Sequence, residues 1–247
     1  MFLNLDLAEF LLLGMSEQNI SFSKKDLFST LFIGEAAAWL IIILAKGLAP
    51  ISFYEKYGDS LGLFAWVVAL GFPLACAVGL YLFYLIGKKI SVVYQIGKFS
   101  LVGGFNTLVD WGILALLILV FRRYLAIEAK EIVSAIPFFS IAFYSFFKAI
   151  SFILAATNSY LWNKFWTFKR ESAERVVKEF VQFIIVSFIG FLLNVSIASG
   201  IFQYIKPAAG LNYDQWAIGA AVMATIISMA WNFLGYKFIV FENEKNS

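Results

Sequence analysis

Six long apolar segments dominate the chain, and charged residues are concentrated between them. A helix needs about 20 mostly apolar residues to cross a hydrocarbon core about 30 Å thick, and each segment meets that length. We expect membrane-spanning helices at Leu27–Ala45, Leu61–Ile86, Phe99–Phe121, Pro137–Trp162, Phe180–Tyr204 and Trp216–Tyr236. The alternation typical of membrane β-barrels is absent. The predicted fold class is therefore all-α, a polytopic bundle of six transmembrane helices.

The third and fifth predicted spans carry the same kind of polar stripe. In the third span, Gly103, Asn106 and Asp110 recur at helical spacing and therefore share one face. A shift of 84 positions brings this stripe onto a second one, which consists of Ser187, Gly190 and Asn194. The two helices thus share one design, in which the copy lacks the carboxylate.

A second repeated motif follows the fourth and sixth spans. YLWNKFWTF at 160–168 aligns with FLGYKFIVF at 233–241, and most shared positions are aromatic or basic. Each repeat is predicted to be a helical hairpin, and the two hairpins should be parallel because a two-span unit returns the chain to its starting side. The predicted regions are a tail or interfacial helix at 1–26, an added transmembrane hairpin at 27–94 and a four-helix domain at 95–247.

The amino-acid composition narrows the possible classes of protein and of function further. With 62% hydrophobic and 14% charged residues, the chain is an integral membrane protein. It has no histidine and one cysteine, Cys76, so an internal disulfide is impossible and a His- or Cys-ligated metal is not expected. Neither a paired-aspartate cluster nor a phosphate-binding glycine loop is found. We expect no enzyme activity, no cofactor and no nucleic-acid binding.

Lysine and arginine are distributed unevenly around the predicted spans. Twelve lie on the side that would carry both termini, Lys98 and Lys164 among them, and six lie on the other side. The positive-inside rule then predicts a multi-pass protein of the cytoplasmic membrane with both termini in the cytoplasm.

Two charges, Asp110 and Lys148, are predicted deep inside adjacent spans, where each costs at least a few kcal/mol. They could form a structural ion pair. Alternatively, Lys148 could bind an anionic substrate group while Asp110 binds a sugar hydroxyl or a proton.

The polar faces of the fourth and sixth spans also allow two interpretations, helix packing or a substrate path. These faces contain Lys148, Ser151, Ala155 and Asn158, and Thr225, Ser228, Asn232 and Gly235.

The motifs resemble those of the GtrA-like family of small polytopic membrane proteins. The resemblance covers roughly Gln95–Phe241, through KFSLVGGFNTLVDWG, YLWNKFWTF and the weaker echoes FVQFIIVSFIGFLLN and WNFLGYKFIVF. It implies a four-helix core that moves polyprenyl-phosphate-linked monosaccharides to the outer leaflet, with membrane glycosyltransferases acting on either side of that step. The residues that match the family's motifs are Asn106, Asp110, Asn163, Lys164, Trp166 and Phe168, whereas Tyr236 replaces an asparagine usual in the second motif.

We therefore expect a flippase for a polyprenyl-phosphate-linked sugar that serves cell-surface polysaccharide glycosylation. The head group would enter a polar groove while the polyprenyl tail stays among membrane lipids. Lys148 or the Lys164 segment would meet the phosphate, and the asparagines and Asp110 would bind the sugar. The candidate substrate-binding residues are Asn106, Asp110, Lys148, Asn158, Asn163, Lys164, Asn194 and Asn232. A translocator this small would suit a homodimer.

Two other classes of function remain open on the sequence. A non-transporting accessory or assembly subunit of a membrane glycosyltransferase would have polar stripes that close against one another and leave no groove. A small proton-coupled exporter would use Glu35, in the first span, or Asp110 to carry its proton.

Overall fold

The structure, a computed structural model, describes residues 20–48, 51–136, 139–170, 176–207, 210 and 213–241. Most of the predicted tail at 1–26 lies outside these residues. The chain divides into two compact units, Met1–Thr167 and Phe168–Ser247.

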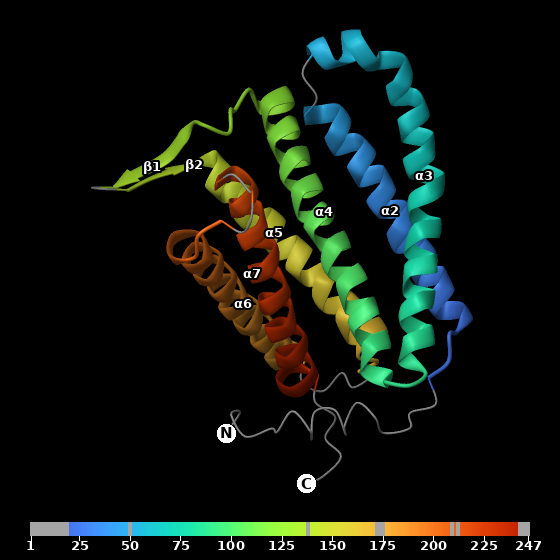
Figure 1. Cartoon of the computed structure of the whole chain (residues 1–247). Helices are drawn as coiled ribbons and strands as arrows, with labels where there is room; N and C mark the ends of the chain where they lie inside the picture. Colours follow the sequence, from blue (N-terminus) through green and yellow to red (C-terminus); the bar gives the residue numbers. More distant parts are fainter. Residues whose placement is uncertain are drawn as a thin grey trace. The chain divides into compact units, whose positions relative to one another are not determined.

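The described residues of the first unit form four helices and a short β-hairpin (Figure 1). The helices are α2 (Lys24–Leu48), α3 (Ile51–Gly87), α4 (Ser91–Leu125) and α5 (Phe143–Trp162). Strands β1 (Ile132–Ile136) and β2 (Phe139–Ala142) pair antiparallel between α4 and α5. A π-helical turn, Asn163–Thr167, continues α5.

The second unit is a helical hairpin of α6 (Val176–Tyr204) and α7 (Tyr213–Gly235). It also ends in a π-helical turn, Tyr236–Val240. The two aromatic-basic motifs therefore adopt the same uncommon backbone after the second helix of each repeat. This agreement supports the repeat that the sequence indicated.

Five of the described helical segments are long and apolar enough to cross a membrane: Lys24–Gly47, Gly62–Gly87, Ser91–Leu125, Val176–Tyr204 and Trp216–Val240. The predicted all-α polytopic membrane fold is confirmed. The fourth predicted span differs in its bounds, because its helix, α5, begins at Phe143 rather than at Pro137. The residues just before it, which are β-branched or aromatic at several positions, form β2 instead. Helix α5 is not among the five segments, so its role as a sixth span stays a prediction.

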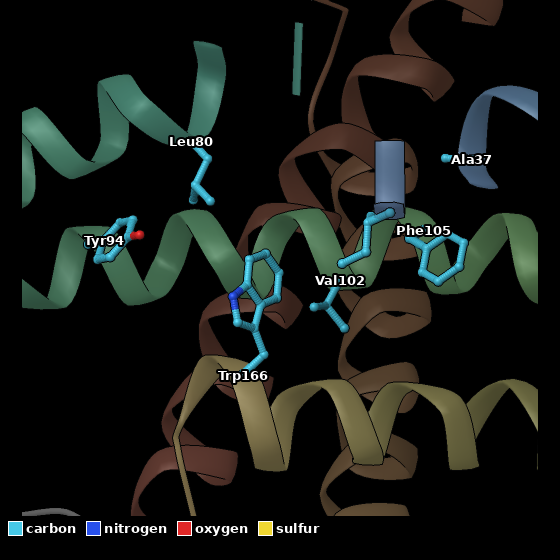
Figure 2. Close-up of a cluster of buried hydrophobic side chains, with 7 residues drawn as sticks. Ala37, Leu80, Tyr94, Val102, Phe105 and Trp166 are labelled. Carbon is cyan, nitrogen blue, oxygen red and sulfur yellow. The ribbon is translucent and has the colours of Figure 1, made fainter. Parts of the chain in front are cut away.

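The core of the first unit joins the added hairpin to the repeat region. It consists of Ile33, Ala37, Leu80, Tyr94, Val102, Phe105 and Trp166. Figure 2 shows the indole of Trp166 reaching from the end of α5 to the face of α4 that carries Val102. Helices α2 and α3 therefore share a core with α4 and with the first aromatic-basic motif.

Glycines allow the three helices α2, α3 and α4 to approach closely, one at each helix pair. A Cβ atom at Gly34 would lie 2.6 Å from the Pro73 Cα atom, which belongs to the α3 backbone. The other two contacts join Gly97 of α4 to Phe83 of α3, and Gly112 of α4 to Leu40 of α2. Such small residues are the usual means of tight helix packing in lipid.

Replacing Gly34 by alanine should therefore lower stability, because the new methyl group meets backbone that cannot rotate away. Overpacking of this kind costs about 1–3 kcal/mol. Gly47→Ala is the matched control, since Gly47 lies on the same helix and a methyl group added there would have nothing within 4 Å. Thermal unfolding in detergent should show a clear loss for Gly34→Ala and none for Gly47→Ala. Equal midpoints for the two variants would contradict this account of the α2–α3 contact.

Candidate functional site

The two charges predicted inside the spans meet between α4 and α5. Asp110 lies near the middle of α4, and its Oδ2 accepts a hydrogen bond from the Lys148 ammonium. Its Oδ1 accepts a second bond from the Ser151 hydroxyl at 2.7 Å. The Asp110 side chain is 17% exposed and that of Lys148 is 39% exposed. Both carboxylate oxygens are thus satisfied, which offsets part of the cost of holding charge in a membrane helix.

The amides of the same two faces meet further along the helices. The Asn158 Nδ2 atom of α5 donates to the Asn106 Oδ1 atom of α4 at 3.4 Å. Asn106 lies one helical turn from Asp110, and Asn158 lies two turns from Ser151. Four predicted site residues, Asn106, Asp110, Lys148 and Asn158, therefore form one polar strip between α4 and α5, as their helical spacing indicated.

The two candidate site residues of the first aromatic-basic motif, Asn163 and Lys164, are buried. Asn163 is 1% exposed and its Nδ2 atom donates to the Ser159 carbonyl at 2.9 Å, while its Oδ1 atom has no partner among the described residues. Lys164 is 2% exposed, and its ammonium lies 3.2 Å from the Tyr160 hydroxyl. The Lys164 segment, which we expected to meet the phosphate, thus forms a packed π-helical turn at this point.

The second repeat builds a neutral version of the same contact. The Asn194 Nδ2 atom donates to the Ser228 hydroxyl at 3.1 Å and to the Thr225 hydroxyl at 3.3 Å. Asn194 corresponds to Asp110, so both residues bind hydroxyl groups of the following helix. In the second unit, neutral hydrogen bonds of Asn194 thus take the place that the Asp110–Lys148 ion pair has in the first.

Two further residues of the second repeat lie along the same helix contact. The Asn232 Oδ1 atom is buried with no partner among the described residues, and Gly190 packs directly against it. Tyr236 shares a hydrogen bond of 2.6 Å with the Ser187 hydroxyl and stacks on Phe183. The tyrosine that departs from the family's usual asparagine is therefore a bridge between α6 and the π-helical turn.

One cluster was missed by the sequence analysis. Asp26 of α2 is 2% exposed, and its Oδ1 atom accepts from the Lys98 ammonium and from the Trp166 Nε1 atom, the latter at 3.0 Å. Lys98 had been placed outside the spans as a topology signal, and that placement was wrong: it is buried within α4. The pattern Ser23-x-x-Asp26 before an apolar run was an available sign that Asp26 has a structural role.

The first unit contains an apolar cavity that lies away from the polar strip. A cavity of about 410 Å³ is lined by Ile33, Ala37, Phe72, Ser100, Leu101, Gly104, Phe105, Thr107, Leu108 and Trp111. Helical periodicity puts the α4 residues of this set on the face opposite Asn106 and Asp110. The cavity is thus not the polar groove that we expected. In the first unit the polar faces of α4 and α5 pack against each other instead.

Comparison with protein families identifies the chain. A family model described as the GtrA/DPMS transmembrane domain matches residues 98–241, more than half of the sequence. The chain belongs to the GtrA/DPMS family. Comparisons with curated proteins and with solved structures find no match. The GtrA/DPMS match includes both polar stripes and both π-helical turns, begins at Lys98, and leaves α2 and α3 outside.

The Asp110–Lys148 contact can be measured with a double-mutant cycle. Asp110→Asn alone should cost about 1–3 kcal/mol, because it leaves the ammonium without its counter-ion. Lys148→Gln should cost less in the Asp110→Asn protein than in the wild type, and the difference, the coupling energy, should be about 0.5–3 kcal/mol. Reversible unfolding in mixed detergent micelles gives the four free energies.

The control for this cycle is Thr157→Val, whose hydroxyl bonds to the Ile153 carbonyl of its own helix at 2.8 Å. Its effect should add to that of Asp110→Asn. Simple additivity of the Asp110 and Lys148 substitutions would mean that their ion pair contributes nothing to folding.

Proposed function

We propose that this GtrA/DPMS-family protein translocates a polyprenyl-phosphate-linked monosaccharide across the cytoplasmic membrane, from a cytoplasmic donor toward cell-surface polysaccharide. Membership of a family linked to flipping of lipid-linked sugars supports this substrate class. The observation that carries the proposal is the polar strip between α4 and α5, with an ion pair near the middle of a membrane-spanning helix. Intramembrane charges of this kind commonly mark a transport path.

The chemistry of the strip suits a phosphorylated sugar. An ammonium such as that of Lys148 binds phosphate through charge-assisted hydrogen bonds, and carboxylate and amide groups bind sugar hydroxyls. When the head group enters, the phosphate would replace Asp110 as the partner of Lys148. Asp110 would then accept hydrogen bonds from the sugar together with Asn106 and Asn158. The exchange keeps an anion beside the Lys148 ammonium and leaves the Asp110 carboxylate held by hydrogen bonds from the sugar, while the tail stays in lipid.

The proposal describes a transporter and not an enzyme. No bond of the substrate is broken, so no cofactor or nucleophile is needed. Membrane glycosyltransferases would be the partners that load the lipid with its sugar on one side and use it on the other.

Flipping can be tested with purified protein in liposomes that contain a labelled polyprenyl-phosphate sugar. Asp110→Asn and Lys148→Gln should each slow translocation about tenfold or more, because a hydrogen bond to a charged group is worth about 1.5–3 kcal/mol. Thr157→Val, on the same helix as Lys148, should leave the rate unchanged. Wild-type rates in both charge variants would remove the proposed site.

A second candidate function is favoured by one observation. The polar stripes of each hairpin close on their own partner helix, as expected for a non-transporting accessory subunit of a membrane glycosyltransferase. On this alternative, wild-type protein alone in liposomes would give the rate of protein-free liposomes, and would instead raise the activity of a co-reconstituted glycosyltransferase. Translocation by the wild-type protein without any partner would exclude it.

A further inference from the structure

The carboxylate of Asp26 uses its two oxygens for two separate tasks. Oδ2 accepts from the Ser23 backbone N–H at 3.0 Å and from the Ser23 hydroxyl at 2.6 Å, and the Asp26 N–H donates to that hydroxyl at 3.1 Å. This reciprocal pair is a capping box at the start of α2. It would be complete without any residue from elsewhere in the chain.

The second oxygen, Oδ1, is held by two donors that belong to other elements. These are the Lys98 ammonium of α4 and the Trp166 indole N–H, which lies in the π-helical turn after α5. The ammonium also lies 4.4 Å from the centre of the Tyr94 ring and 5.4 Å from that of Trp166. The Tyr94 hydroxyl is buried and lies near the same carboxylate. A buried cation, an indole donor and a tyrosine hydroxyl thus gather around one carboxylate, which is the make-up of an anion site.

The donors and their occupant come from different parts of the chain. Lys98 and Trp166 lie within the region that matches the family, residues 98–241, and Asp26 lies outside it. The anion-binding pair is therefore part of the family domain, whereas the anion that fills it is supplied by α2. Carboxylate and phosphate are bound by the same charge-assisted donors.

Exposed positive charge surrounds this end of the unit. Lys24 and Lys25 open α2, and Lys88 and Lys89 follow α3; all four are exposed. The two ends adjoin, because the Phe22 ring packs on Tyr84, and the Lys88 ammonium lies over the same tyrosine ring. Within residues 20–30 and 81–98, all of them described, the one acidic side chain is that of Asp26. Such a basic rim attracts anionic head groups at a membrane surface.

We propose that Lys98 and Trp166 form a binding site for a phosphate group, and that Asp26 is a tethered occupant which the phosphate displaces. Displacement frees only Oδ1, so the capping box of α2 persists through Oδ2. The ligand chemistry is a phosphate, carried by a lipid head group or free in solution. The inference rests on the proposed function only for the expectation that the phosphate arrives on a polyprenyl tail.

The test measures binding of polyprenyl monophosphate to purified protein in detergent by native mass spectrometry. Asp26→Asn should tighten binding about tenfold or more, because a competing charge is removed while the amide can still cap α2. Adding Lys98→Gln should abolish that gain, and adding Trp166→Phe should reduce it. Glu35→Gln is the matched control, since Glu35 is an exposed acid of the same helix that accepts an indole N–H from Trp39 at 2.8 Å. It should leave binding unchanged.

Two further ligands distinguish the source of the phosphate. Competition by inorganic phosphate would identify a site for free phosphate, whereas binding of polyprenyl phosphate without such competition would identify a lipid head-group site. Polyprenol, which lacks the phosphate, should bind equally to wild type and Asp26→Asn.

Equal affinity of wild type and Asp26→Asn for polyprenyl phosphate would overturn the proposal and leave Asp26 as a permanent counter-ion. A gain that survives Lys98→Gln would overturn it too. If Asp26→Asn does not fold, Lys98→Gln alone replaces it: without the ammonium the wild-type affinity for polyprenyl phosphate should fall about tenfold or more, and unchanged affinity would contradict the proposal. Asp110→Asn should retain this binding even where translocation is lost, so failure here and failure of the proposed function are separate results.

Discussion

A charged side chain inside a membrane helix must be paired, and this requirement arranges the whole first unit around α4. That helix carries one member of two ion pairs, the buried Lys98–Asp26 pair and the partly buried Asp110–Lys148 pair. One pair fixes α2 and the other fixes α5. Because the two α4 residues are twelve positions apart, the pairs are separated by about 18 Å along the helix axis. Close glycine contacts and the apolar core then bring α3 into the same bundle.

Both ion pairs join a lysine to a carboxylate, so the same exchange of anions can operate at each of them. Each lysine is paired with an internal carboxylate, so each can exchange that carboxylate for a phosphate and keep an anionic partner, while hydrogen bonds hold the released carboxylate. In this scheme Lys98 receives the phosphate near the start of α4, beside the basic rim, and Lys148 of α5 receives it opposite the middle of α4. The second unit repeats the hairpin with amide and hydroxyl groups in place of charges, so its contact between α6 and α7 carries no phosphate partner of this kind.

Much of this arrangement follows from the sequence, and the misses have physical reasons. Helical spacing alone predicted that Asn106 and Asp110 would share a face, and that face does meet the polar face of α5. The strand pair before α5 was missed because a short apolar run is compatible with either a strand or a buried helix. Lys98 was misassigned because counting basic residues near span ends treats each as solvated. The partner of Lys98 is 72 positions away, and no local pattern records such a pairing.

The most direct test of the central claim is a structure of the protein in a lipid nanodisc with a bound polyprenyl-phosphate monosaccharide. The account predicts that the head group lies between α4 and α5, that the phosphate contacts the Lys148 ammonium, and that Asp110 has moved from that ammonium to a sugar hydroxyl. A head group bound elsewhere, with the Asp110–Lys148 pair and the Asn106–Asn158 contact still closed, would contradict it.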